Sequence, residues 1–284
     1  MRVSVICVTL TIGGCADPDT HDELAEIIVE PAGIQYTPPV AITPPLVAVK
    51  PAVINHGPRN AKRIALTFDA CSLNADSYYD ERVARILIDM KIPATIFVGG
   101  KWMLDHPGPL RTLASLPQFE IANHGFLHPH MTSLSDERVR EELKGTQDTM
   151  YALIGRQATL FRAPYGEINN RLVKIAAENG LRTVQFDLPS GDADKKASKG
   201  KLIEYVSTVA KPGSIVVMHI NRRGWHTAEA LPEIIKNLRK RGFEFVTVSE
   251  LLELDPKPIE APPADTARVT PSAPSWYDEI YERN

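Results

Sequence analysis

Two histidines four residues apart, His124 and His128, stand in the run Asn-His-Gly-Phe-Leu-His-Pro-His. Imidazole nitrogens suit zinc, cobalt, nickel or iron. A hydrolytic metal also needs a carboxylate base, an acid for the leaving group and donors for a developing oxyanion. Asp69, His219 and the backbone around Tyr165 could supply these three. The pattern predicts metal-assisted hydrolysis, and its structural alternative is a pair of ordinary histidines in a turn.

The elements that must position these groups are short apolar strands that alternate with longer amphipathic segments. We expect strands near residues 64–69, 94–99, 119–123, 159–163, 182–187, 214–219 and 244–248. Helical patterns fill the gaps, for example at 80–90, 136–154, 169–178 and 227–241. The second of these begins after Ser135, which we expect as its N-cap. Such alternation implies mostly parallel strands with helices on the faces, as an open sheet or a barrel.

The polar residues favour the barrel. Asp69, His124, Arg162, Asp187 and His219 each lie at or just beyond the C-terminal end of a predicted strand. Catalytic groups collect at that rim in barrels. We therefore expect an α/β fold, a distorted (β/α) barrel of about seven strands, with Pro-rich extensions at both ends.

Composition fits one soluble catalytic domain with extensions. The chain has 284 residues, of which 43% are hydrophobic, so it can bury a sizeable core. Its formal charge of −3 provides no basic excess to displace phosphate counterions. We therefore expect no nucleic-acid partner.

The first fifteen residues are typical of an export signal. Arg2 supplies a positive charge, residues 3–12 are mostly apolar, and Ile12-Gly13-Gly14-Cys15 resembles a bacterial lipobox. In a lipobox the cysteine is lipidated, and several acyl chains would hold the protein firmly on a membrane. We expect a protein exported to the bacterial cell envelope, lipid-anchored at Cys15 or periplasmic. Ordinary secretion and a buried first strand are the alternatives.

The rest of the chain divides by composition. Residues 16–60 are rich in proline and predict a tether, residues 61–254 predict the catalytic domain, and residues 255–284 predict a second Pro-rich tail. The tail ends in an aromatic and acidic stretch that we expect to fray rather than dock. Only Cys71 lies outside the signal region, so no disulfide framework is expected.

Five motifs in order resemble the polysaccharide deacetylase family, carbohydrate esterase family 4, over roughly residues 60–253. The first, second, third and fifth are Thr67-Phe68-Asp69, the run from His124 to Pro129, Arg162-Ala163-Pro164-Tyr165 and Val217-Met218-His219. The family includes chitooligosaccharide, peptidoglycan and acetylxylan deacetylases. The resemblance implies roles for six residues: Asp69 as general base, His124 and His128 as metal ligands, Arg162 orienting the base, the Tyr165 amide binding the oxyanion, and His219 protonating the leaving group.

The first motif departs from the family pattern, which has a second aspartate as a metal ligand where this chain has Ala70 followed by Cys71. Two histidines rarely hold a catalytic cation alone. The third ligand could be Asp69, Asp76, Asp80, a water or, as a weaker candidate, the Cys71 thiolate. Asp80 could instead cap the following helix, and Cys71 could be a small packed residue.

The fourth motif is also altered, and only Asp192 aligns comfortably with the family's acidic residues. A carboxylate there could pair with Arg162 or tune His219. The alternative is a turn built by residues 189–191, with Asp192 capping it locally.

These observations predict a metal-dependent hydrolase that removes acetyl groups from an N-acetylated or O-acetylated polysaccharide. Cell-wall peptidoglycan is the first expected substrate, and zinc is the first expected metal, with cobalt and nickel as alternatives. The rival hypotheses are a non-catalytic glycan-binding lipoprotein that has lost its metal, and a hydrolase of a non-sugar amide. The sequence carries no prediction of oligomeric state.

Overall fold

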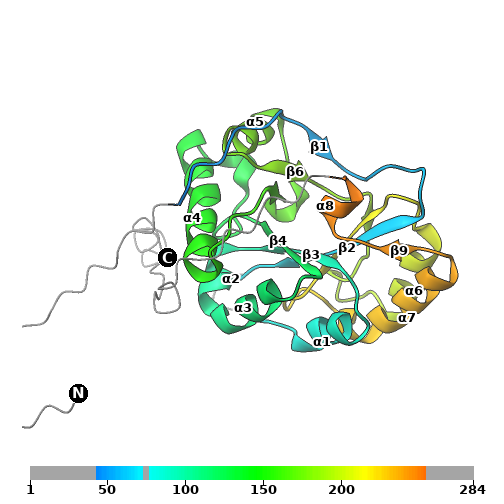
Figure 1. Ribbon diagram of the computed structural model, residues 1–284. Helices are drawn as coiled ribbons and strands as arrows, with labels where there is room; N and C mark the ends of the chain where they lie inside the picture. Colours follow the sequence, from blue (N-terminus) through cyan, green and yellow to red (C-terminus); the bar gives the residue numbers. More distant parts are fainter. Residues whose placement is uncertain (1–42, 73–76, 254–284) are drawn as a thin grey trace, which may run out of the picture. The chain divides into compact units, whose positions relative to one another are not determined.

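The computed structural model describes residues 43–72 and 77–253 (Figure 1). The predicted signal segment 1–15, the tail 255–284 and most of the predicted tether lie outside these residues, and the domain boundaries remain predictions. Among the described residues, no helix combines the length and apolar character that crossing a membrane requires.

Within residues 43–72 and 77–253, nine strands form one sheet in which every paired strand is parallel to its neighbour. The order is β1 (Val53–Ile54), β6 (Arg182–Val184), β5 (Leu160–Phe161), β4 (Phe119–Asn123), β3 (Ala94–Val98), β2 (Arg63–Ala70), β8 (Ile215–His219) and β7 (Leu188–Pro189), with β9 (Glu244–Phe245) paired to β2. In the described part of the chain β1 and β7 do not pair with each other, so the barrel is incomplete. The predicted distorted (β/α) barrel is confirmed, and β1 and β7 are additional to the seven predicted strands.

The described residues contain eight α-helices. They are α1 (Glu81–Asp89), α2 (Gly100–Asp105), α3 (Pro107–Ser115), α4 (Asp136–Ile154), α5 (Asn170–Glu178), α6 (Lys199–Val209), α7 (Thr227–Lys240) and α8 (Val248–Leu251). Helix α4 begins where predicted, because the Ser135 hydroxyl accepts the Arg138 N–H at 3.2 Å. It ends at Gly155, whose φ of +65° suits a left-handed cap. Neighbouring helices pack in two series, α5–α4–α3 and α1–α7–α6 (Figure 1).

The two faces of β2 explain how an apolar strand carries a polar group into the site. Leu66, Phe68 and Ala70 are fully buried in the large core that includes the helices. Side chains alternate along a strand, so Thr67 and Asp69 share the opposite face. Truncation of Phe68 to alanine would cost about 3–5 kcal/mol of stability, because it opens a cavity beneath this strand.

Asp187 does not lie at the C-terminal rim, where the sequence placed it. Strand β6 ends at Val184, and β7 begins at Leu188 after a bend at Asp187. Asp187 lies beside the N-terminal end of β8, where it accepts the Ile215 N–H at 2.9 Å and a hydrogen bond from Arg59 at 2.7 Å. Its prediction as a rim residue was wrong, because one apolar run was read as a single longer strand.

Part of the predicted tether belongs to the sheet. Val53 and Ile54 form β1 and lie opposite Thr183 and Val184 of β6. Just before them, the Val49 N–H donates to the carbonyl of Ala177 at 2.9 Å. These contacts join this end of the Pro-rich segment to the barrel.

Candidate active site

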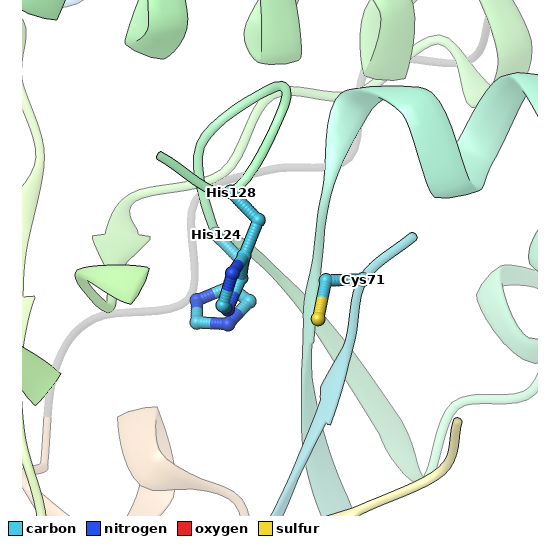
Figure 2. Close-up of side chains that lie close together, drawn as sticks. All are labelled: Cys71, His124 and His128. Atoms are coloured by element: carbon cyan, nitrogen blue, oxygen red, sulfur yellow. The ribbon is translucent and has the colours of Figure 1, made fainter. Parts of the chain in front are cut away.

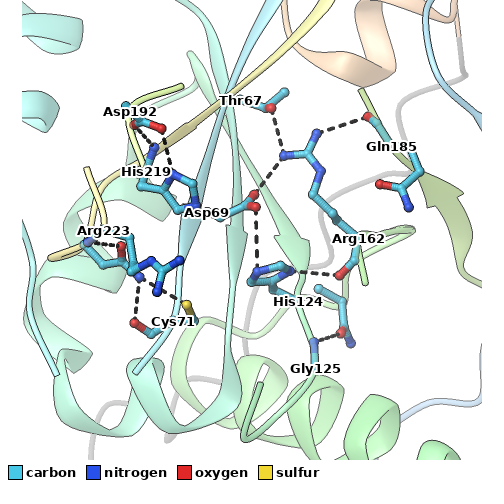
Figure 3. A network of polar contacts seen from close by, with 12 residues as sticks. Thr67, Asp69, Cys71, His124, Gly125, Arg162, Gln185, Asp192, His219 and Arg223 are labelled. Carbon is cyan, nitrogen blue, oxygen red and sulfur yellow. Dashed lines mark hydrogen bonds and ion pairs between the residues drawn. The ribbon is translucent and has the colours of Figure 1, made fainter. Parts of the chain in front are cut away.

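The C-terminal ends of four strands bring the predicted site residues together (Figure 3). Asp69 lies near the end of β2 and His219 ends β8, where the two residues are register partners. His124 follows β4, and Arg162 follows β5. The rim that the sequence predicted therefore holds these four side chains.

Asp69 and Arg162 form a buried ion pair. The guanidinium Nη1 donates to Asp69 Oδ1 at 2.8 Å and to the Thr67 hydroxyl at 2.8 Å (Figure 3). Its other end donates to the carbonyl of Gln185 at 3.3 Å, and its plane lies 4.0 Å from the centre of the Phe97 ring. Arg162 is fully buried, so these contacts fix where the carboxylate points.

The surrounding charges keep Asp69 ionised. Burial by itself would raise the pKa of this carboxyl, but the positive charge of Arg162, with contributions from His124 and His219, holds the pKa below its ordinary value. The free oxygen, Oδ2, lies 3.7 Å from His124 Nε2. Asp69 therefore offers a proton acceptor that is directed towards the histidine cluster.

Asp192 binds His219, which was one of the two functional possibilities seen in the sequence. Its Oδ1 accepts from ring Nδ1 at 2.9 Å, and its Oδ2 accepts from the His219 backbone N–H at 2.7 Å (Figure 3). The Thr227 hydroxyl, which sequence reasoning missed, donates to the same Oδ2 at 2.7 Å. Because Nδ1 carries the proton for this bond, Nε2 is the nitrogen left for chemistry.

The carboxylate also changes the protonation of His219. Burial would lower the pKa of the imidazole, but the charge and hydrogen bond of Asp192 outweigh burial and raise the pKa above its ordinary value. The arrangement favours a protonated imidazole, which is the form that a general acid requires.

Three potential metal ligands lie close together next to Asp69. Ligand atoms of Cys71, His124 and His128 all lie within 4.8 Å of one another, and among the described residues no other group of three or more metal-binding side chains occurs (Figure 2). His124 Nδ1 donates to the carbonyl of Arg162 at 2.8 Å, so its Nε2 keeps a free lone pair. His128 Nδ1 is buried and has no hydrogen-bond partner among the residues described.

Both histidines are suited to bind a cation. Burial lowers the pKa of His124, and burial together with the neighbouring His124 lowers the pKa of His128 to about 3. The rings are therefore neutral near neutral pH, and each can offer a nitrogen lone pair. An unpartnered buried nitrogen beside imidazole and sulfur donors fits a divalent metal of the zinc type.

The loop that carries the histidines is held by a residue that sequence reasoning missed. The Glu142 carboxylate, on the buried side of α4, accepts the backbone N–H groups of Phe126 and Leu127 at 2.6 and 2.8 Å. His128 has a φ of +61°, which costs energy in a residue other than glycine. A carboxylate on the apolar face of a predicted helix was the signal available in the sequence, because such groups are rarely buried without partners.

The predicted candidates for a third metal ligand differ in where the structure places them. Both carboxylate oxygens of Asp80 bind the Arg82 guanidinium. Asp80 Oδ1 also caps α1, because it accepts the backbone N–H of Arg82 at 3.1 Å. The helix-cap alternative is therefore confirmed for Asp80. Asp76 lies outside the described residues. Cys71, the weaker candidate, is the one that lies with the histidines.

Tyr165 lies in a strained turn beside the cluster. Its φ is +58°, and within the described part of the chain its backbone N–H donates to no acceptor. The half-exposed ring stacks on His130 at 4.1 Å and meets His128 edge-on at 4.5 Å. The unpaired N–H is thus available to a ligand, as the oxyanion role would require.

Comparison with known proteins gives consistent relatives. The polysaccharide deacetylase family model matches residues 56–184. A peptidoglycan-N-acetylglucosamine deacetylase of Bacillus cereus is 33% identical over 199 residues, covering 69% of this chain and 90% of that protein. A peptidoglycan-N-acetylmuramic acid deacetylase of Bacillus subtilis is 29% identical, covering 69% of this chain and 73% of that protein.

One similar solved structure is described as inactive. A pseudoenzyme of carbohydrate esterase family 4 from Bacillus anthracis is 27% identical and matches with a TM-score of 0.64, over 72% of this chain and 69% of its own. A mutant of that protein with restored enzymatic activity matches with the same TM-score at 29% identity, over 72% of each chain.

Proposed function

The chain belongs to the polysaccharide deacetylase family, and we propose that it hydrolyses acetyl groups from an N-acetylated glycan, with cell-wall peptidoglycan as the first substrate. The observation that carries this proposal is the placement of Asp69 and His219 as register partners beside the His124–His128 pair. The proton acceptor Asp69 and the proton donor His219 therefore lie at the same end of the barrel, next to two imidazole rings that suit a metal.

The roles of the side chains follow from their contacts. When bound at His124 and His128, a divalent metal supplies polarisation of the acetyl carbonyl and activation of water. Asp69 takes the proton of the attacking water, while Arg162 keeps the carboxylate ionised and oriented. The Tyr165 N–H donates to the oxygen of the tetrahedral intermediate. His219 then gives a proton to the leaving nitrogen, so the products are acetate and a free amine.

We propose zinc as the resident metal, with cobalt and nickel as alternatives. Two neutral imidazoles favour these ions over magnesium or calcium, which take oxygen ligands. The buried, unpartnered Nδ1 of His128 supports this assignment, because a buried polar group without a partner is costly unless a ligand satisfies it.

The substrate and location are proposed from the relatives and from the N-terminal signal. Two relatives are peptidoglycan deacetylases by name, one for N-acetylglucosamine and one for N-acetylmuramic acid. The lipobox-like Cys15 would place the enzyme in the cell envelope, where peptidoglycan lies. Membrane contact would then be made through the lipid anchor.

A non-catalytic glycan-binding protein is the second candidate. Ala70 stands at the position where the family has a metal-binding aspartate, and one similar structure is a pseudoenzyme. The retained contacts favour catalysis, since the Asp69–Arg162 pair is buried and the Asp192–His219 pair is partly buried. Glycan binding alone would not require a proton acceptor and a proton donor at the same rim.

Acetate release tests the proposal. The purified full chain is incubated with N-acetylated peptidoglycan and with chitooligosaccharides, before and after chelation, and then with zinc, cobalt or nickel restored. We expect release that disappears on chelation and returns with metal, and we expect Asp69→Asn to abolish it. Glycan binding without acetate release under any metal would support the binding protein, and release from neither glycan but from simple amides would support the non-sugar amidase.

A further inference from the structure

We propose that Cys71 is the third protein ligand of the metal, so that the centre is built from two imidazoles and one thiolate. The inference rests on the proposed function, because it names the ligand set of the metal used there. It departs from the family pattern, in which an aspartate one residue earlier fills this position.

The candidate ligand lies one residue later in the chain. Ala70 is fully buried in the core that faces the helices, and its methyl group offers no ligand atom. Cys71 follows at the end of β2 and is only 4% exposed. Figure 2 shows its sulfur beside the two rings that descend from the loop after β4.

The distances suit a tetrahedral centre after a small contraction. The sulfur and the ligand nitrogens lie within 4.8 Å of one another. Zinc bonds of about 2.3 Å to sulfur and about 2.0 Å to nitrogen place such donors roughly 3.5 Å apart. Modest side-chain movement therefore closes the site, and the fourth position stays open for water or substrate.

Asn221 provides independent evidence that the sulfur acts as an acceptor. Its Nδ2 donates to Cys71 Sγ at 3.1 Å and to the carbonyl of Cys71 at 2.9 Å. Its Oδ1 accepts the Arg223 N–H at 3.0 Å, which fixes the amide orientation, since a flipped amide would lose this bond. A buried amide that donates to sulfur is the kind of outer partner that orients a metal-bound thiolate.

The other candidate carboxylates in the described residues have other contacts or another role. Asp80 binds Arg82 through both oxygens. Asp69 binds Arg162 through Oδ1, and its free Oδ2, 3.7 Å from His124 Nε2, is the proton acceptor of the proposed function. A thiolate also carries the same single negative charge as the aspartate it would replace, so the net charge of the centre is conserved. Its softness adds preference for zinc or cobalt over magnesium.

Cobalt spectroscopy of the full chain tests the ligand directly. Cys7→Ser and Cys15→Ser leave Cys71 as the only thiol among the three cysteines. Cobalt(II) is titrated into this metal-free protein and into the same protein with Cys71→Ser, which keeps the size of the side chain. We expect a near-ultraviolet thiolate-to-cobalt charge-transfer band in the first protein and its loss in the second, with zinc affinity at least tenfold weaker.

Two further variants serve as a second test and as a control. Asn221→Ala keeps the thiol, and we expect the band to remain but to shift, together with weaker zinc binding. His130→Ala removes an exposed imidazole near the site and should leave the band and the affinity unchanged. If Cys71→Ser fails to fold, judged by circular dichroism, the Asn221→Ala spectrum decides the question.

The outcomes separate this inference from the proposed function. A protein without the charge-transfer band, or with equal zinc affinity before and after Cys71→Ser, would overturn the thiolate ligand even if acetate is released. A protein that shows the band but releases no acetate would keep the Cys71 site and remove the deacetylase proposal.

Discussion

Asp69 and His219 are register partners on β2 and β8, so the proposed base and acid stand on adjacent parallel strands. Neighbouring strands lie about 4.8 Å apart, which sets the separation of the two backbones without any loop between them. A substrate amide that enters at this rim can therefore meet both groups at once. Their spacing depends on the sheet itself.

Asp69→Asn should lower kcat for acetate release by about 10²–10⁴-fold, because asparagine cannot accept the proton of water. It should also destabilise the protein by about 3–5 kcal/mol, because Arg162 keeps a buried charge without its partner. Activity is therefore measured per folded molecule, with unfolding followed in denaturant. Asp187→Asn is the matched control, since this carboxylate is hydrogen-bonded at the opposite edge of the sheet. Near-normal kcat in Asp69→Asn would remove the assigned role.

Asp192→Asn should move the alkaline limb of the kcat/KM profile to lower pH. Asp192 raises the pKa of His219, and the proposed acid works only while protonated, so activity is lost as pH rises through that pKa. The raised pKa also stabilises the fold at low pH, and this contribution is lost as pH rises through the folded-state value. Asp194→Asn, two residues further along the chain, should leave the profile unchanged. An unshifted limb in Asp192→Asn would show that another group sets it.

His219→Ala should affect substrates according to their leaving group. Acetate release from an N-acetylated sugar should fall by about 10²–10⁴-fold, because the departing amine needs a proton. Hydrolysis of 4-nitrophenyl acetate should fall far less, because 4-nitrophenolate leaves without protonation. Equal losses on the two substrates would mean that His219 acts in positioning rather than as an acid.

Glu142→Gln should weaken zinc binding by roughly 10–100-fold without removing a ligand, as expected for outer partners of a metal site. A neutral amide cannot accept both loop N–H groups as well, so the turn that carries the histidines loosens. Zinc affinity is measured by competition with a chelator of known strength. Glu141→Gln is the control, because Glu141 also binds Arg138 but lies outside the loop contacts. Similar affinities in the two variants would contradict the anchoring role.

The strands and the main site residues were predictable because apolar runs of strand length each ended at a polar residue. The run near 182–187 misled, since β6 covers only its first three residues and a bend at Asp187 separates β6 from β7, a two-residue strand that includes Pro189. The partners of Glu142 and Asn221 could not be identified from the local sequence pattern, because Phe126 and Leu127 lie 16 and 15 residues from Glu142, and Cys71 lies 150 residues from Asn221. The placement of Cys71 beside the two histidines could not be predicted, because the sequence does not show that the Ala70 side chain faces the core.

Strand β2 is hydrogen-bonded on both sides, by β3 and β8, whereas β7 is a short strand at one end of the sheet. Amide hydrogens of β2 should therefore exchange with solvent only through global unfolding, and those around β7 through local opening. Asp192 follows β7, so a fluctuation that leaves Asp69 in place can release His219 from its carboxylate. The two halves of the proposed acid–base pair thus differ in kinetic protection, since the base lies on the slowly exchanging strand and the partner of the acid lies just after the rapidly exchanging one.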